Sequence, residues 1–349
     1  MMRNPGHRRA GLLRRVRADT PCRSTRRAFL IALGAGALAP FASFAQQQPA
    51  KVARIGFLGA ESALGYASNV EAMRAGLRDL GYVEGKNIVI EYRWAEGNYD
   101  RLPDLAAELV RLKVDVLVTH GAPGTRAAKR ATTTVPIVMA TGGDAVATGL
   151  VASLARPGGN ITGSTFFALE INAKRLELLK EVFPRTKRVA ILLHPDNPIN
   201  GPLLQAMERT AKSLKVELQQ FEVRGPNDFN GAFSAMAKKR MGAVVIPEYS
   251  MFFGNAGAIA DLASKQQFPS IGFKEIAEAG VLMGYGVNNP ELWRRTAVFV
   301  DKIFKGAKPG DLPIERATKF ELIVNMKTAR ALGVKIPQSI LVRADKVIE

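Results

Sequence analysis

The stretch Asp115–Ala140, DVLVTHGAPGTRAAKRATTTVPIVMA, contains one complete unit of the fold. Its apolar run at Asp115–Thr119 predicts a buried strand, and the glycine-rich His120–Gly124 predicts a turn. A helix is expected to start at Thr125, and a second strand, opened by a proline, is expected at Pro136–Ala140. Strand, helix and strand in this order are typical of a parallel sheet that is covered by helices on both faces.

The same alternation continues on both sides of this unit. Upstream, strands are predicted at Val52–Leu58 and Asn87–Arg93, and amphipathic helices at Asn69–Leu80 and Arg101–Leu112. Downstream, Asp144–Leu154 is predicted as a short helix that ends before a Pro-Gly-Gly sequence. The first half of the chain therefore predicts one doubly wound α/β sheet.

The second half repeats this plan at an offset of about 130 residues, which is far longer than the period of a solenoid repeat. The expected strands are Arg188–Leu193, Val216–Val223, Ala243–Pro247 and Pro269–Phe273. The expected helices are Asn200–Leu214, Asn227–Arg240 and Ala256–Gln266. An offset that is nearly constant over four strands favours two similar lobes over the alternative of one large sheet.

The last part of the sequence predicts how the lobes are joined. An apolar run at Val281–Tyr285, a helix at Pro290–Lys305 and a strand at Phe320–Asn325 follow the second repeat. Crossings between the lobes are expected at Gly159–Gly163, Tyr285–Gly286 and Ala317–Phe320. The predicted fold is α/β, with two doubly wound Rossmann-like lobes joined by a three-stranded hinge. The first lobe would span residues 52–160 plus 287–317, and the second 163–284 plus 320–349.

Charge is concentrated at the N-terminus. The chain has a net charge of +18, and its first 45 residues hold nine Arg but a single acidic residue, Asp19. Arg26-Arg27 precede the charge-free run Ala28–Phe44, which leads to small residues before a cleavage point after Ala45. We interpret residues 1–45 as a cleaved signal peptide of the twin-arginine type, which predicts a periplasmic protein. A nucleic-acid-binding arm and an uncleaved membrane anchor are the alternatives.

Candidate binding residues are those that follow the predicted strands, because ligands of open α/β sheets bind outside the carboxyl ends of the strands. Polar and aromatic side chains gather there, as expected for a small, partly apolar ligand. The candidates are Ser62, Tyr66, His120, Thr125, Asp144, Phe166, His194, Glu248, Tyr249 and Tyr285. The alternatives are that Asp144 caps a helix, that the two histidines are ordinary loop residues and that the aromatic residues belong to the core.

Catalytic and cofactor motifs are missing from the sequence. Gly56-Phe57-Leu58-Gly59 has the wrong spacing for a dinucleotide fingerprint, and no phosphate-binding loop, zinc-protease or nucleophile-elbow motif occurs. The single cysteine, Cys22, lies in the predicted leader and would be lost on cleavage. We therefore expect no cofactor, no metal site and no enzymatic activity.

Several strings of this sequence resemble the substrate-binding proteins of ABC transporters, in particular those related to tryptophan-type binders. The resemblance covers essentially the whole chain after the leader. It is carried by Arg54–Gly59, Gly76–Ile88, Glu91–Gly97, Leu150–Asn160, Phe299–Gly306 and Phe320–Asn325.

The resemblance implies a type I periplasmic-binding fold and capture of a small ligand for an ABC permease in the inner membrane. Relatives in this family bind aromatic or branched amino acids. For such a ligand, Ser62 and Thr125 are expected to bind the carboxylate, and Glu248 or Asp144 the ammonium. Tyr66, Phe166 and Tyr249 are expected to contact the side chain. A monomer that binds no nucleic acid is expected. The alternatives are a sensor module for a membrane receptor, and an enzyme on the same scaffold, such as a sugar-processing transferase.

Overall fold

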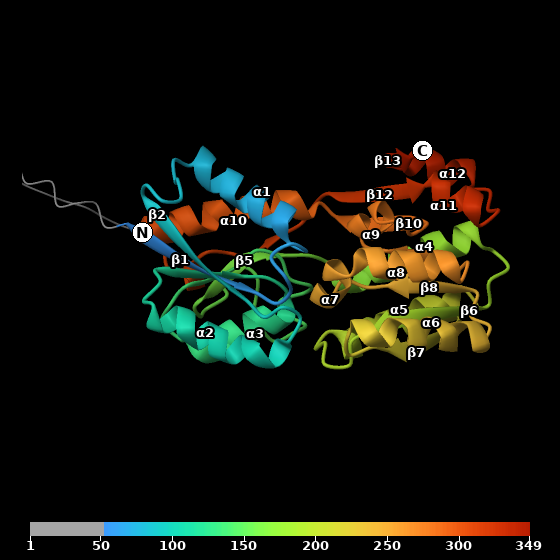
Figure 1. Ribbon diagram of the computed structural model, residues 1–349, viewed down its shortest axis with the longest axis horizontal. Helices are drawn as coiled ribbons and strands as arrows, with labels where there is room; N and C mark the ends of the chain where they lie inside the picture. The colour runs from blue at the N-terminus through green and yellow to red at the C-terminus, as the bar shows by residue number, and fades with distance from the viewer. Residues whose placement is uncertain (1–51) are drawn as a thin grey trace, which may run out of the picture. The chain divides into compact units, whose positions relative to one another are not determined.

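The computed structural model describes residues 52–349, so the predicted leader lies outside the described residues. Within this range the first sheet has six parallel strands in the order β2-β1-β3-β4-β5-β11 (Figure 1). The strands are β1 (Ala53–Gly59), β2 (Ile88–Trp94), β3 (Val116–Thr119), β4 (Ile137–Met139), β5 (Ile161–Thr165) and β11 (Glu315–Arg316). Strand order reverses between β1 and β3, which is where doubly wound sheets bind their ligands.

Helices cover both faces of the first sheet. On one face α1 (Ala67–Asp79) packs against α10 (Asn289–Phe304), and on the other α2 (Leu102–Arg111) packs against α3 (Gly121–Ala131) (Figure 1). The contact between α1 and α10 is close, because a Cβ added at Gly76 would lie 2.4 Å from the carbonyl oxygen of Arg294. Helix α10 comes from much later in the sequence, yet it completes the core of the first lobe with Trp293.

The second sheet has seven strands within the described residues, in the order β7-β6-β8-β9-β10-β12-β13. These are β6 (Arg188–Leu193), β7 (Glu217–Glu222), β8 (Ala243–Ile246), β9 (Ser270–Gly272), β10 (Met283–Val287), β12 (Phe320–Asn325) and β13 (Lys346–Ile348). β10 and β12 are antiparallel, and the other neighbours are parallel. The order of its first five strands repeats that of the first sheet, which confirms the predicted two-lobed α/β fold.

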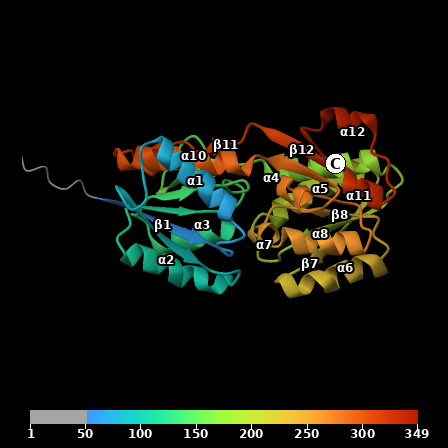
Figure 2. The same cartoon turned by 45° about the horizontal axis from the view of Figure 1, so that its top comes forward.

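The second sheet is also covered on both faces. α4 (Ala168–Val182) packs against α5 (Asn200–Ser213), and α6 (Phe229–Lys238) packs against α8 (Ala256–Lys265), as Figure 2 shows for the second pair. Shorter helices are α7 (Ser250–Gly254), α9 (Lys274–Glu278), α11 (Met326–Ala331) and α12 (Gln338–Arg343). Three 3₁₀ turns lie at Tyr99–Arg101, Pro226–Asp228 and Pro309–Asp311. No helix in residues 52–349 is long and apolar enough to cross a membrane.

Two predicted helices differ from the structure, and one long helix was not predicted. Helix α3 starts at Gly121 and not at Thr125, because Pro123 is accommodated in the first helical turn. The helix predicted at Asp144–Leu154 is a series of turns, in which the Asp144 carboxylate accepts from two backbone N–H groups and Gly149 has a φ of +70°. Helix α4 was not predicted.

The chain passes between the sheets at three places. The first passage, Phe166–Phe167, follows β5 and lies a few residues after the expected position, because residues 161–165 form a strand of the first sheet. The second is at Asn288, between β10 and α10, and the third is at residues 317–319, between β11 and β12. Each passage is short, so the relative position of the lobes depends on few backbone angles.

Candidate binding site

A cavity lies where loops at the carboxyl ends of both sheets face one another. The space between its lining atoms is about 620 Å³, part of which is open to solvent at the mouth. The first lobe contributes Tyr66 and the segments 120–122 and 141–143. The second contributes Asn172, Ile199, Leu203 and the segment 247–250, while Phe166 comes from a passage between the lobes.

Five of the ten candidate residues line this cavity: Tyr66, His120, Phe166, Glu248 and Tyr249. Four of them lie in loops after β1, β3 or β8, the strands beside the reversal points of the two sheets, and Phe166 follows β5. The aromatic members supply apolar wall, and burial raises the pKa of both tyrosine hydroxyls, so these stay protonated.

Two hydroxyl candidates lie outside the cavity wall and are used locally. Ser62 Oγ accepts a hydrogen bond from the Gly65 N–H at 3.2 Å, which closes a turn. Thr125 Oγ1 donates to the Gly121 carbonyl at 2.7 Å, within the first turn of α3. Both hydroxyls therefore bond to nearby backbone groups.

The remaining three candidates also lie outside the wall. Asp144 caps its own turn, with Oδ1 accepting from the N–H groups of Val146 and Ala147. His194 stacks on Tyr249 with ring centroids 4.7 Å apart. The Tyr285 ring stacks on Phe320 at 6.2 Å, near a passage between the lobes.

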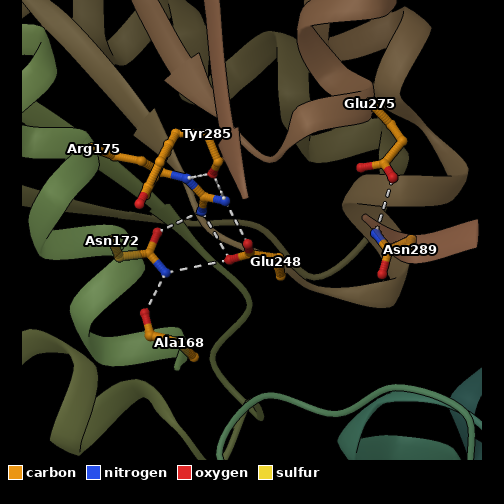
Figure 3. A network of polar contacts seen from close by, with 7 residues as sticks. All are labelled: Ala168, Asn172, Arg175, Glu248, Glu275, Tyr285 and Asn289. Atoms are coloured by element: carbon orange, nitrogen blue, oxygen red, sulfur yellow. Dashed lines mark hydrogen bonds and ion pairs between the residues drawn. The ribbon is translucent and has the colours of Figure 1, made fainter. Parts of the chain in front are cut away.

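Glu248 is paired with an arginine that the sequence analysis missed. Arg175 is fully buried, and its Nη1 donates to Glu248 Oε2 at 2.8 Å while its Nη2 contacts Oε1 (Figure 3). Arg175 Nε and Nη2 also donate to the Tyr285 carbonyl, at 2.8 and 2.6 Å. Asn172 bridges the pair, accepting from Arg175 at 2.8 Å and donating to Glu248 at 3.3 Å.

This network is a buried ion pair with its hydrogen-bonding groups satisfied. A buried carboxylate is tolerated when a bidentate guanidinium and further donors surround it, and it becomes costly when the partner is removed. The Glu248 side chain therefore presents a neutralised surface to the cavity. Because Arg175 also holds the Tyr285 carbonyl, the network ties the cavity wall to strand β10.

The first lobe presents a different kind of wall. His120 is 1% exposed, and its ring centroid lies 4.1 Å from that of Tyr66 and 5.2 Å from that of Trp293. Burial lowers the pKa of His120 to about 3, so the imidazole is neutral near pH 7. Within the described residues, His120 Nε2 and Thr141 Oγ1 are buried without a hydrogen-bond partner. Both residues line the cavity, next to the N-terminus of α3.

The two lobes touch directly around the cavity. Gly121 has a φ of +65°, and a Cβ there would lie 2.6 Å from Ser250 Oγ of the other lobe. The Tyr66 side chain hydrogen-bonds Ser250. Tyr99 of the first lobe lies 5.8 Å from both His194 and Tyr249 of the second, measured between ring centroids. These contacts describe lobes closed on the cavity.

A second buried acid lies beside these contacts. Glu61 is 5% exposed and accepts a hydrogen bond from the Tyr99 hydroxyl at 2.5 Å. Burial raises its pKa to about 7. Glu61 lies two residues after β1 ends at Gly59, and this place in the loop after a strand was the signal that could have identified it.

Asn172 and Arg175 were missed because α4 was not predicted. The signal was present: two polar residues stand on the apolar face defined by Ile171, Leu178 and Val182. Polar residues on a buried helical face require partners, which makes them candidates for a network or a site. No group of three or more His, Cys, Asp or Glu that could hold a metal occurs in residues 52–349.

A family model and a characterised relative both match most of this chain. The family model described as ABC transporter substrate binding protein matches residues 58–348. A protein named tyrosine-binding protein from Clostridioides difficile (strain R20291) is 26% identical over 260 residues, covering 74% of each chain.

Two solved structures share the fold. An ABC domain from Streptococcus pneumonia in complex with L-Trp has a TM-score of 0.79 and 24% identity, covering 85% of this chain and 99% of that one. A conserved domain protein from Vibrio cholerae has a TM-score of 0.80 and 26% identity, covering 85% and 100%. Together with the family match over most of the sequence, these findings show that this chain belongs to the ABC transporter substrate-binding protein family.

Proposed function

We propose that this protein captures a small carboxylate ligand, an amino acid or a related acid, and delivers it to the permease of an ABC importer. The observation that carries this proposal is the cavity between the two lobes, with an apolar and aromatic wall and unpartnered buried polar atoms. The names of relatives that bind tyrosine or are solved with L-Trp support a ligand of this size and chemistry.

Closure of the hinge is the mechanism that fits this geometry. Ligand first binds one lobe, and the second lobe adds contacts as the short passages between the sheets bend. Only the difference in affinity between open and closed forms can shift the population toward the closed form. A permease that recognises loops from both lobes would then distinguish loaded from empty protein. We assign the contacts with ligand to Tyr66, His120, Phe166, Glu248 and Tyr249.

The proposed cellular location of this activity depends on the predicted signal peptide. Export through the twin-arginine signal at residues 1–45 would place the protein in the periplasm, where a monomer could diffuse to its permease. No observation in the described part of the chain favours a sensor module or a transferase over this role.

A thermal-shift panel tests the proposal. The purified protein is heated with amino acids, small aliphatic carboxylates, aromatic acids and sugars, each at several concentrations. A ligand at 100 times its dissociation constant is expected to stabilise the protein by about 2.7 kcal/mol. A saturable shift with one chemical class supports a binding protein, whereas conversion of the ligand into a product would contradict it and favour an enzyme.

A further inference from the structure

The charges around the cavity define the class of ligand more narrowly. Among residues 52–349, Glu248 is the single acidic residue in the wall, and no Lys or Arg lines it. Both Glu248 oxygens are held by the fully buried Arg175. The wall therefore carries no net charge and has no free acid to pair with a cation.

The other acids near the cavity do not supply that charge. Glu61 and Glu275 do not line the cavity. Glu61 accepts from Tyr99, and Glu275 Oε1 accepts from Asn289 at 3.1 Å, while Glu275 Oε2 is buried without a partner among the described residues. Burial raises the pKa of both carboxyls, which favours their neutral forms. Asp144 is used in its own turn. An ammonium group enclosed here would lose its hydration without gaining a counter-ion, which strongly disfavours binding.

Groups that suit an anion are present in the opposite wall. The N-terminus of α3, an 11-residue helix, lies at the cavity with Gly121 and Ala122. The Gly121 N–H already donates to the Thr141 carbonyl at 2.9 Å, so this helix end offers the Ala122 N–H and the positive end of the helix dipole. His120 Nε2 and Thr141 Oγ1 are buried beside it without partners in the described chain. A neutral imidazole N–H and a hydroxyl can both donate to a carboxylate. Bound ligand would satisfy atoms that otherwise remain buried and unpaired.

We propose that the ligand is an aromatic carboxylate that lacks an α-ammonium group, bound by His120, Thr141 and the N-terminus of α3. Its ring would lie among Tyr66, Phe166 and Tyr249. This inference rests on the proposed function and narrows it, since it selects the related acid over the amino acid.

Matched ligands that differ in one group test the inference. Isothermal titration calorimetry compares phenylalanine with 3-phenylpropanoate, and tyrosine with 3-(4-hydroxyphenyl)propanoate. We expect the acid without the ammonium to bind at least tenfold more tightly in each pair. The neutral analogue 3-phenylpropanamide is expected to bind at least tenfold more weakly than 3-phenylpropanoate, because it loses the charge that the helix N-terminus favours.

The two histidines outside the leader provide a matched pair of variants. His120→Phe keeps a ring next to Tyr66 but removes Nε2, and is expected to weaken binding of 3-phenylpropanoate at least tenfold with little effect on the amide. His194→Phe also changes a histidine that stacks on a tyrosine, but outside the wall, and is expected to leave the affinity unchanged. Thr141→Val replaces His120→Phe if circular dichroism shows that the latter does not fold.

Each result is decisive. Equal or tighter binding of the amino acids overturns the inference and leaves the binding-protein function intact. Failure of both members of both pairs also overturns it, and the broader thermal-shift panel then separates a different ligand class from failure of the proposed function. An equal loss of affinity in both histidine variants would show that His120 has only a structural role.

Discussion

The two walls of the cavity come from sheets with the same strand order, yet their chemistry is opposite. In the second lobe every hydrogen-bonding group of the Arg175–Glu248–Asn172 network has a partner within the protein. In the first lobe, His120 Nε2 and Thr141 Oγ1 are buried with none among the described residues. The polar network in the second-lobe wall thus has all its hydrogen bonds without a ligand, whereas the first-lobe wall has buried polar atoms that a ligand could bind. A repeated fold therefore specifies where a site lies but not which lobe selects the ligand.

Removing the Arg175 guanidinium from the second-lobe wall is expected to have the largest effect on stability. Arg175→Met leaves the Glu248 carboxylate buried without its partner, and should lower the free energy of unfolding by about 3–5 kcal/mol. Urea unfolding measures this loss. The double variant Arg175→Met, Glu248→Gln removes both charges and should recover much of the stability. If the double variant is as unstable as the single one, packing and not charge explains the role of Arg175.

Glu61 gives the first lobe a stability that depends on pH. Its folded-state pKa is raised from 4.5 to about 7, so the folded form holds a proton that the unfolded form has released between these values. The stability from this group is full below about pH 4.5 and is lost as the pH rises through about 7. At 1.36 kcal/mol per unit of pKa, the loss is at most about 3 kcal/mol.

Thermal or urea unfolding from pH 4.5 to 8 measures this dependence. Glu61→Gln keeps the size of the side chain and removes its titration, so its stability should vary less across that range. Glu71→Gln serves as a control, because the Glu71 carboxylate is exposed and contacts Arg78 on the surface. A pH profile of Glu61→Gln that is identical to that of the unchanged protein would refute the role of Glu61.

The contact between the walls can be broken at Gly121. Gly121→Ala places a Cβ against Ser250 Oγ and puts an L-residue at a φ of +65°, with an expected loss of about 1–2 kcal/mol for the backbone strain alone. Ligand affinity measured by calorimetry should fall further, since the clash occurs between the lobes. Adding Ser250→Gly removes the clash and should restore the ligand affinity, but the backbone strain at residue 121 and its cost in stability should remain. Equal affinities of the two variants would show that the contact does not influence closure.

The smallest effect is expected at Ser62, which lies in a turn after β1 and outside the cavity wall. Ser62→Ala removes one hydrogen bond within an exposed turn and should change the free energy of unfolding by less than about 0.5 kcal/mol. Calorimetry should show no change in affinity. A clear loss of affinity would place Ser62 in the site and would weaken the distinction between the two walls.

The sequence allowed the fold to be predicted well because strand periodicity is local and occurs twice. Placing candidates at strand ends also brought Tyr66, His120 and Glu248 to one cavity. The direction of individual side chains could not be predicted. The hydroxyl groups of Ser62 and Thr125 bond to nearby backbone and not to a ligand. Which of the two partners a hydroxyl takes depends on the geometry of the turn. The charge of Glu248 could not be judged without α4, whose Arg175 is 73 residues away in sequence.

The position of α10 and β11 has a consequence for how the chain folds. Residues 289–316 follow β10 of the second lobe in the sequence but complete the first lobe, with Trp293 filling a core built around Phe57 and Met73. During synthesis, the ribosome must make most of the second lobe, from α4 to β10, before this part of the first core can close. Until then, the apolar side of α1 is uncovered, and a truncated chain would expose it permanently. The lobe that begins the polypeptide is thus closed only after most of the other lobe has been made, and residues 320–349 then complete the second sheet.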